Sequence, residues 1–142
     1  MNTTIPCRIY YSNEDSVWYV EAPGFYEGIM TYGTTLEEAQ AMASDAISGL
    51  IESFIDRQIP LTIPLPVVAA DVYPIAPAPS VAFALWLRAK RKASGMTLTD
   101  VADKLSVKYQ VYQKLENPET ANPTLKTIAK LERVFGETVV LI

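Results

Sequence analysis

The side chains best suited to chemistry in this 142-residue chain lie between residues 97 and 117. Apolar residues recur there at steps of three and four in two short stretches separated by a tight turn, which predicts two short helices. In the second stretch, a rotation of about 100° per residue places Val111 and Leu115 inward. Lys108 and Lys114 can meet phosphates or guanine, and the amides and hydroxyls on the outward face can hydrogen-bond base edges in a DNA groove. That outward set is Tyr109, Gln110, Gln113 and Asn117.

Three further features must position this face. A helix is expected over residues 80–94, with Gly95 as its C-terminal cap. Thr97 is placed to cap the next helix, with Asp100 in the capping-box position, and Val107 is placed to fill the space under the turn. The apolar stripe of that second helix comprises Leu98, Val101, Ala102 and Leu105. Two helices joined in this way form a helix-turn-helix pattern, which is typical of DNA-binding proteins.

A closing helix is expected over residues 124–135, ended by Gly136. Four of its residues are predicted to face the core: Leu125, Ile128, Ala129 and Leu131. The tail at 138–142 is too apolar to be left in water and too short for a helix. We therefore expect a terminal strand that pairs with a second copy of the chain, with packing onto its own domain as the alternative.

Charge is divided unevenly along the chain. Residues 1–65 carry two basic and nine acidic side chains, whereas residues 81–142 carry ten basic and six acidic ones. A basic half suits a polyanionic partner and an acidic half suits a different one. Charge alone leaves open that both are ordinary solvated faces, and the helix-turn-helix pattern favours the DNA interpretation over a plain polar surface.

Composition excludes several classes of site. Cys7 is the single cysteine and histidine is absent, so neither a disulfide nor a zinc site is supported, and we expect no cofactor. Without histidine, acid–base catalysis would need clustered carboxylates, lysine or the thiol, and no such cluster is visible, so we expect no enzyme. The longest apolar runs are far shorter than the ~20 residues that span a bilayer, and no signal peptide is recognisable, which predicts a cytoplasmic protein with no membrane partner.

The chain is expected to divide at a proline-rich segment, residues 66–80. Prolines at this density favour extended chain over helix or central strand, and the apolar residues between them suggest that the segment lies against a domain surface. The predicted organisation is an N-terminal domain at 1–65, the linker, and an all-α DNA-binding and dimerisation domain at 81–142.

The N-terminal segment is expected to form an antiparallel meander followed by one long helix. Its three predicted strands are residues 6–11, 16–22 and 28–32. Thr35 is placed to cap the helix in a capping box with Glu38, and an apolar face continues to about Arg57. Within the helix, Gly49 is either a tolerated defect or a point of close packing on a strand. Residues 59–65 are predicted as a fourth strand, at the sheet edge because of their prolines.

This arrangement, with its Pro23-Gly24 turn, the phrase Tyr-Gly-Thr-Thr-Leu-Glu-Glu-Ala at 32–39 and the Ile-Pro-Leu ending at 59–61, resembles the N-terminal domain of HicB-type antitoxins. The resemblance covers residues 5–65. It implies an α+β chain whose N-terminal domain has a partial, inactive ribonuclease-H-like fold. It also implies that this domain captures a small basic HicA-like toxin that cleaves messenger RNA, and blocks the toxin's catalytic histidine.

Residues 88–136 resemble the Cro/repressor-type helix-turn-helix proteins. The resemblance places the base-contacting positions on Tyr109, Gln110 and Lys114, and a structural ion pair on Arg91 and Glu116. To the base readers we add Gln113, and to the DNA-backbone contacts Thr97, Lys108 and Asn117. Two departures from the family pattern are Leu98, where glutamine is usual, and Ser106, where glycine is usual.

Together these patterns predict an antitoxin that neutralises its toxin and represses its own operon as a homodimer or higher homo-oligomer through the C-terminal domain, matching an operator with two half-sites. Four acidic residues are expected to be exposed and are candidates for toxin contact: Glu14, Asp15, Glu27 and Glu37. The alternative is a one-component regulator whose N-terminal domain senses a small molecule. An active nuclease is the third hypothesis, disfavoured because the acids are scattered.

Overall fold

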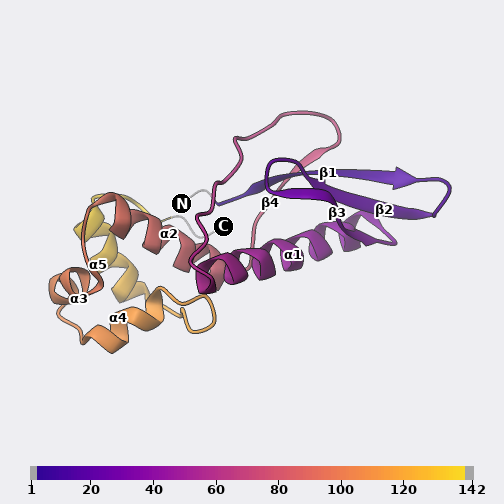
Figure 1. The fold of residues 1–142 in the computed structure, drawn as a ribbon. Helices are drawn as coiled ribbons and strands as arrows, with labels where there is room; N and C mark the ends of the chain where they lie inside the picture. The colour runs from indigo at the N-terminus through magenta and orange to yellow at the C-terminus, as the bar shows by residue number, and fades with distance from the viewer. Residues whose placement is uncertain (1–2, 140–142) are drawn as a thin grey trace. The chain divides into compact units, whose positions relative to one another are not determined.

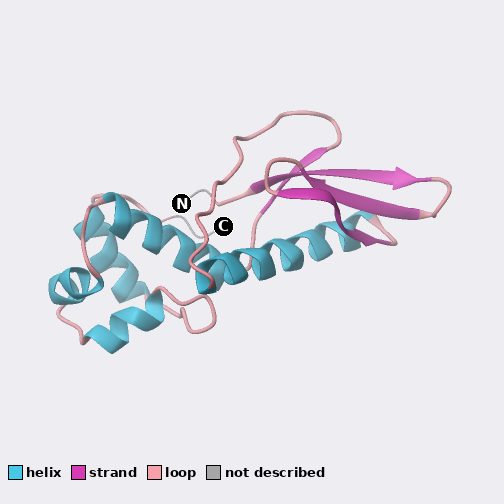
Figure 2. Ribbon diagram, viewed as in Figure 1, coloured by secondary structure: helices cyan, strands magenta, loops and turns pink. Residues whose placement is uncertain are grey.

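The computed structural model describes residues 3–139, which divide into two compact units at 3–78 and 79–139 (Figure 1). The first unit is a sheet with one long helix, and the second consists of helices and loops, so the chain has the α+β character expected from the sequence (Figure 2). No helix in the described range is both long enough and apolar enough to cross a lipid bilayer.

The N-terminal unit is built on a four-stranded antiparallel sheet. Its strands are β1 (Ile5–Ser12), β2 (Val17–Ala22), β3 (Tyr26–Gly33) and β4 (Val72–Ile75), in the spatial order β3-β2-β1-β4. The first three confirm the predicted meander, each within two residues of the expected bounds. Their β-branched and aromatic residues suit a pleated surface of which one face is buried.

The fourth strand comes from a different segment than predicted. Residues 59–65 form no strand, and β4 instead lies inside the segment predicted as linker, 66–80. β4 pairs antiparallel with β1, and its Ile75 is buried opposite Ile5. Proline has no amide hydrogen, so the edge position of β4 is what allows Pro74 to sit within it. Along the chain, the boundary between the two units falls after Ala78 rather than at residue 65.

The long helix α1 (Leu36–Asp56) begins as predicted. The Thr35 hydroxyl accepts a hydrogen bond from the Glu38 amide at 3.0 Å, while the Glu38 carboxylate reaches the Thr34 hydroxyl rather than the cap residue's own amide. The helix contacts all four strands and buries four residues of its apolar stripe: Ala39, Ala43, Ile47 and Ile51. Gly33 packs closely against the first turn of this helix, because a β-carbon on Gly33 would lie 2.4 Å from the Ala39 nitrogen.

Gly49 lies in the middle of α1, and a β-carbon built there meets no atom within 4 Å. The close-packing interpretation is therefore wrong at this position. Gly49 is a tolerated defect, which costs an exposed helix interior about 1 kcal/mol relative to alanine.

The C-terminal unit contains α2 (Pro79–Ala93), α3 (Leu98–Leu105), α4 (Tyr109–Leu115) and α5 (Leu125–Phe135). Its core gathers buried residues from all four helices, among them Leu87, Val101, Leu105, Tyr112 and Leu131. All four residues of the predicted α3 stripe are buried or pack against this core. Glycines at positive φ follow α2 and α5, as the sequence predicted for both helix ends.

The predicted core face of α5 is partly wrong. Ile128 and Leu131 are buried, but Leu125 is 83% exposed and Ala129 is exposed as well. Val134 and Phe135 pack against the core instead, so the inward face is shifted toward the C-terminal end of the helix. Leu125 begins α5 directly after a loop, and none of residues 3–139 covers its side chain.

The predicted terminal strand is absent from the part of the tail that the structure describes. Thr138 and Val139 are not in a strand, and residues 140–142 lie outside the described range. Val139 packs against the core of its own unit, as the alternative interpretation proposed.

Candidate nucleic-acid interface

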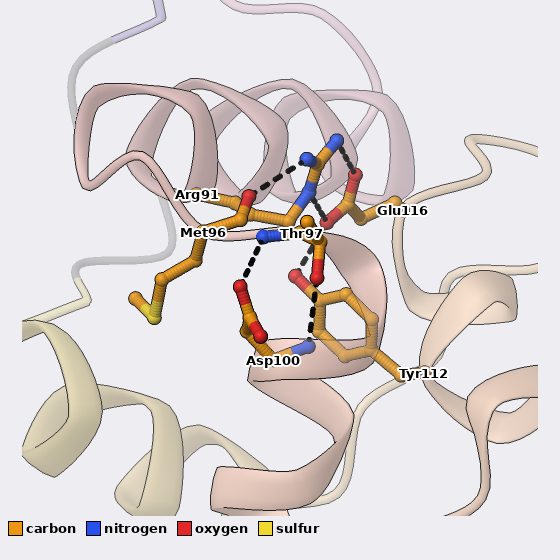
Figure 3. Close-up of polar contacts among 6 residues, drawn as sticks. All are labelled: Arg91, Met96, Thr97, Asp100, Tyr112 and Glu116. Atoms are coloured by element: carbon orange, nitrogen blue, oxygen red, sulfur yellow. Dashed lines mark hydrogen bonds and ion pairs between the residues drawn. The ribbon is translucent and has the colours of Figure 1, made fainter.

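The entry of α3 is held by a reciprocal capping box (Figure 3). The Asp100 amide donates to the Thr97 hydroxyl at 3.1 Å, and the Thr97 amide donates to the Asp100 carboxylate at 2.8 Å. The bond from the Thr97 amide lowers the pKa of Asp100, because it stabilises the charged carboxylate. The predicted capping box is confirmed, and it fixes where the helix-turn-helix begins.

The turn between α3 and α4 requires a left-handed residue. Ser106 has φ 57° and ψ 42°, the conformation that favours glycine, and its amide donates to Asp103. Val107 packs against the core, as predicted, and its amide donates to the Ala102 carbonyl at 3.0 Å. The serine found in place of the usual glycine therefore keeps the turn geometry, at a cost of roughly 1 kcal/mol in backbone strain.

A buried polar network joins α2 to α4 (Figure 3). Arg91 donates to the Glu116 carboxylate through Nε at 2.7 Å and through Nη2 at 3.1 Å, and its Nη1 donates to the Met96 carbonyl at 3.2 Å. The Tyr112 hydroxyl donates to the same carboxylate. The Glu116 side chain is only 3% exposed, so three donors compensate a carboxylate that water cannot reach.

The pKa values of the two donors follow from this arrangement. The bond to Glu116 raises the pKa of Arg91, and burial together with the bond to Glu116 raises the pKa of Tyr112. Both groups are therefore protonated near neutral pH and can donate to Glu116. The ion pair implied by the resemblance is thus present in the structure, with a role in positioning α4.

Tyr112 is the member of this network that sequence reasoning missed. We predicted that Val111 faces inward, but Val111 is 50% exposed and Tyr112 is fully buried. Tyr112, Leu115 and Glu116 lie three and four residues apart on one face, so the buried carboxylate sets the rotation of α4. The missed signal was the Tyr-to-Glu spacing of four residues.

The outer surface of α4 carries the predicted base-reading residues. Tyr109, Gln110, Gln113 and Lys114 are all exposed, and their spacing of one, four and five residues places them on one side of the helix. Val111 lies in the same exposed surface and can meet a thymine methyl group. The buried network on the opposite side orients these side chains outward.

The three predicted backbone contacts surround α4 and α3. Lys108 is the N-cap of α4, is exposed, and makes no side-chain capping bond. The Asn117 side-chain Oδ1 accepts a hydrogen bond from the Glu119 amide at 3.0 Å, which leaves the side-chain NH₂ group to donate outward. The Thr97 hydroxyl accepts from Asp100 but can still donate its own hydrogen to a phosphate at the start of α3.

The four acidic toxin-contact candidates are all exposed, as predicted, but they do not converge. Glu14 and Asp15 lie in the turn between β1 and β2, and Glu37 lies in the first turn of α1, just after the end of β3 that pairs with the start of β2. Glu27 lies at the beginning of β3, at the opposite end of the sheet. Asp15 also accepts hydrogen bonds from Tyr19 and Ser12.

Within residues 3–139, no three His, Cys, Asp or Glu residues are grouped so that they could hold a metal ion. Cys7 is buried, and burial raises the pKa of its thiol to about 12. The thiol is therefore protonated near neutral pH, and a protonated thiol is a poor nucleophile.

Comparison with known proteins adds to this geometry. The helix-turn-helix family model matches residues 87–142, the segment that contains α3, α4 and α5. The chain has no match among curated proteins. The family match and the capped, ion-paired helices together support a helix-turn-helix DNA-binding domain in the C-terminal part of the chain, and with it a role in transcription regulation.

Proposed function

We propose that this protein represses the operon that encodes it by reading operator DNA with α4. The observation that carries the proposal is the two-sided character of α4, with a buried ion-paired face and a polar exposed face. A rigid helix that presents amides and a lysine on one side suits a major groove, where glutamine can pair with adenine and lysine with guanine.

The base-reading role belongs to Tyr109, Gln110, Gln113 and Lys114, and the phosphate-contacting role to Thr97, Lys108 and Asn117. We further propose that the protein binds as a homodimer or higher homo-oligomer through the C-terminal unit, because paired half-sites demand two copies of α4. The excess of basic over acidic residues in 81–142 supports binding to a polyanion.

For the N-terminal unit we propose the role of an antitoxin, which binds a small basic HicA-like toxin that cleaves messenger RNA. The resemblance of residues 5–65 to HicB-type domains supports this role, as does the charge of the unit. Between residues 3 and 78 there are ten carboxylates against two arginines. The unit then acts by binding rather than by catalysis, as an inactive relative of ribonuclease H.

The DNA proposal is tested on the full chain with a fragment of its own promoter. Gln110→Ala should weaken specific binding by roughly 1–3 kcal/mol while leaving nonspecific binding unchanged. Lys108→Ala should weaken binding to all sequences alike. It should also make the plot of log affinity against log salt concentration less steep, by the amount expected for about one lost phosphate contact. Gln40→Ala, the same substitution on α1, is the matched control. Identical footprints for all three variants would remove α4 from the interface.

The antitoxin proposal is tested by co-expression with any small open reading frame that lies next to this gene. The expected result is that the neighbour is toxic alone, harmless with this chain, and co-purifies with it. A harmless neighbour that forms no complex would refute the proposal. A reproducible thermal shift with one metabolite would instead favour the small-molecule sensor.

A further inference from the structure

We propose that the face of the sheet opposite α1 is a docking surface for a basic protein, which contacts a row of tyrosines and the carboxylates beside it. The inference rests on the proposed antitoxin function and specifies where on the N-terminal unit the partner binds. The four exposed acids chosen from the sequence do not define one surface, whereas this face does.

The strand register identifies which residues share the face. Residues paired across β1 and β2, such as Ile9 and Val20, are buried on the side that α1 covers. The alternate positions point to the other side. There, two rows cross the sheet: Tyr10, Tyr19 and Tyr32 form one, and Val72, Arg8, Glu21 and Ile29 form the next.

The tyrosine row is a continuous aromatic strip. The ring centroids of Tyr10 and Tyr19 lie 6.1 Å apart, and those of Tyr19 and Tyr32 lie 6.5 Å apart with an edge-to-face arrangement. Tyr32 is 56% exposed and Ile29 in the neighbouring row is 49% exposed. Aromatic residues with few rotatable bonds are the side chains that dominate protein interfaces.

Hydrogen bonds hold this strip in one geometry. The Tyr10 hydroxyl donates to Glu21 at 2.9 Å, and the Tyr19 hydroxyl donates to Asp15 at 2.6 Å. These bonds raise the pKa of both tyrosines, which keeps them protonated donors. Rings that are already fixed lose little conformational entropy when a partner binds.

Arg8 shows what such a surface accommodates. Its guanidinium lies 4.5 Å from the centroid of the Tyr10 ring and within 3.5 Å of the Glu21 carboxylate. A cation is thus already held between an aromatic face and a carboxylate by contacts within the chain. Tyr19 with Asp15 offers the same pair of groups at the next strand, and no cation of the part of the chain that the structure describes forms an ion pair with Asp15.

Charge decides the kind of partner. The unit that carries this face has ten carboxylates, two arginines and no lysine between residues 3 and 78, so a nucleic acid would be repelled. A protein that presents arginine or lysine side chains meets both the ring faces and the carboxylates. At the β4 edge of the face, residues 66–69 line a pocket together with Pro6, Val72 and Pro74.

The test uses the full chain and the purified product of the adjacent open reading frame, with affinities measured by calorimetry. The Tyr32→Thr/Ile29→Thr variant should bind at least about tenfold more weakly, since it removes two exposed apolar contacts. Tyr26→Thr is the matched control, because Tyr26 is 41% exposed on the same strand but pairs with Ala22 of the helix-covered side. That control should bind within about twofold of the unchanged protein.

A second variant, Glu21→Gln, removes a charge from the face without removing a ring, and should weaken binding and flatten its dependence on salt. Far-UV circular dichroism and retained promoter binding show that each variant is folded. If the unchanged chain and all variants bind the partner protein with equal affinity, the docking surface alone is overturned. No binding by the unchanged chain overturns the antitoxin proposal and the surface with it. If light scattering gives the double variant, measured without the partner, a lower molecular mass than the unchanged chain, the surface serves self-association and is overturned as a partner site.

Discussion

Replacing Arg91 with methionine is the sharpest test of how α4 is positioned. The substitution keeps most of the aliphatic stem but removes three donors, two to Glu116 and one to the Met96 carbonyl. The Glu116 carboxylate, 3% exposed, would then be left with the Tyr112 hydroxyl as its partner among the described residues. Leaving a buried charge without its counter-ion costs about 3–5 kcal/mol.

That cost is large for a unit of this size. Small domains are stable by about 5–15 kcal/mol, and a unit this small loses about 1 kcal/mol of stability per molar urea. The urea midpoint of the C-terminal unit should therefore fall by about 3 M or more. Trp86 reports on this unit because it is 5% exposed within its core, and Trp18→Phe removes the tryptophan of the other unit.

Two further variants separate the buried pair from a surface pair. Lys90, the neighbouring residue, pairs with Glu137 where both side chains are more than a third exposed, so Lys90→Met should cost less than about 1 kcal/mol. The triple variant Arg91→Met/Glu116→Leu/Tyr112→Phe removes every member of the network and should recover most of the stability that Arg91→Met loses. The reasoning is refuted if Arg91→Met costs no more than Lys90→Met, or if the triple variant is the least stable.

Four more substitutions have outcomes that follow from local geometry. Ser106→Gly should raise the stability of the C-terminal unit by about 0.5–1 kcal/mol, because glycine adopts the left-handed turn without strain; an unchanged urea midpoint would contradict this. Gly49→Ala should stabilise the N-terminal unit by about 1 kcal/mol, since a β-carbon meets open space there. Gly33→Ala should destabilise the same unit by about 1–3 kcal/mol, because its β-carbon would collide with the α1 backbone, and thermal melts distinguish the two opposite signs. The pKa of Asp100 is lowered in the folded state, so the contribution of its carboxylate to stability is complete above the usual pKa of 3.8 and is lost as the pH falls through the lower pKa of the folded state. Between about pH 4 and pH 2, the melting temperature of Asp100→Asn should therefore fall less than that of the unchanged chain.

The elements that the sequence predicted well are those in which local chemistry and periodicity agree. The three strands of the meander, the cap of α1 at Thr35 and the capping box of α3 all depend on residues close together in the chain. The tight turn between α3 and α4 was predicted in the same way, from the distance between two amphipathic stretches, whereas its left-handed geometry at Ser106 comes from the structure. These features need no knowledge of distant partners.

The errors fall where a distant partner decides between local alternatives. Residues 59–65 and 72–75 are both short, apolar and interrupted by proline, and only the edge of β1 selects the second as a strand. Leu125 fits the helical period of α5, yet no described residue covers it, so it is 83% exposed. Local periodicity cannot say which stretch of a helix has a neighbour.

By itself, the sequence determined the order of the first three strands and of the helices, the helix caps and the division of charge between an acidic first part and a basic second part, because each of these depends on residue type and short spacing. Tertiary structure decided the rotation of α4, since Tyr112 turns inward only because Glu116 and Arg91 lie buried beside it. It also decided which strand closes the sheet and which side chains gather on its open face. A strand alternates its side chains between two faces, and only the register with its neighbours brings Tyr10, Tyr19 and Tyr32 into one row.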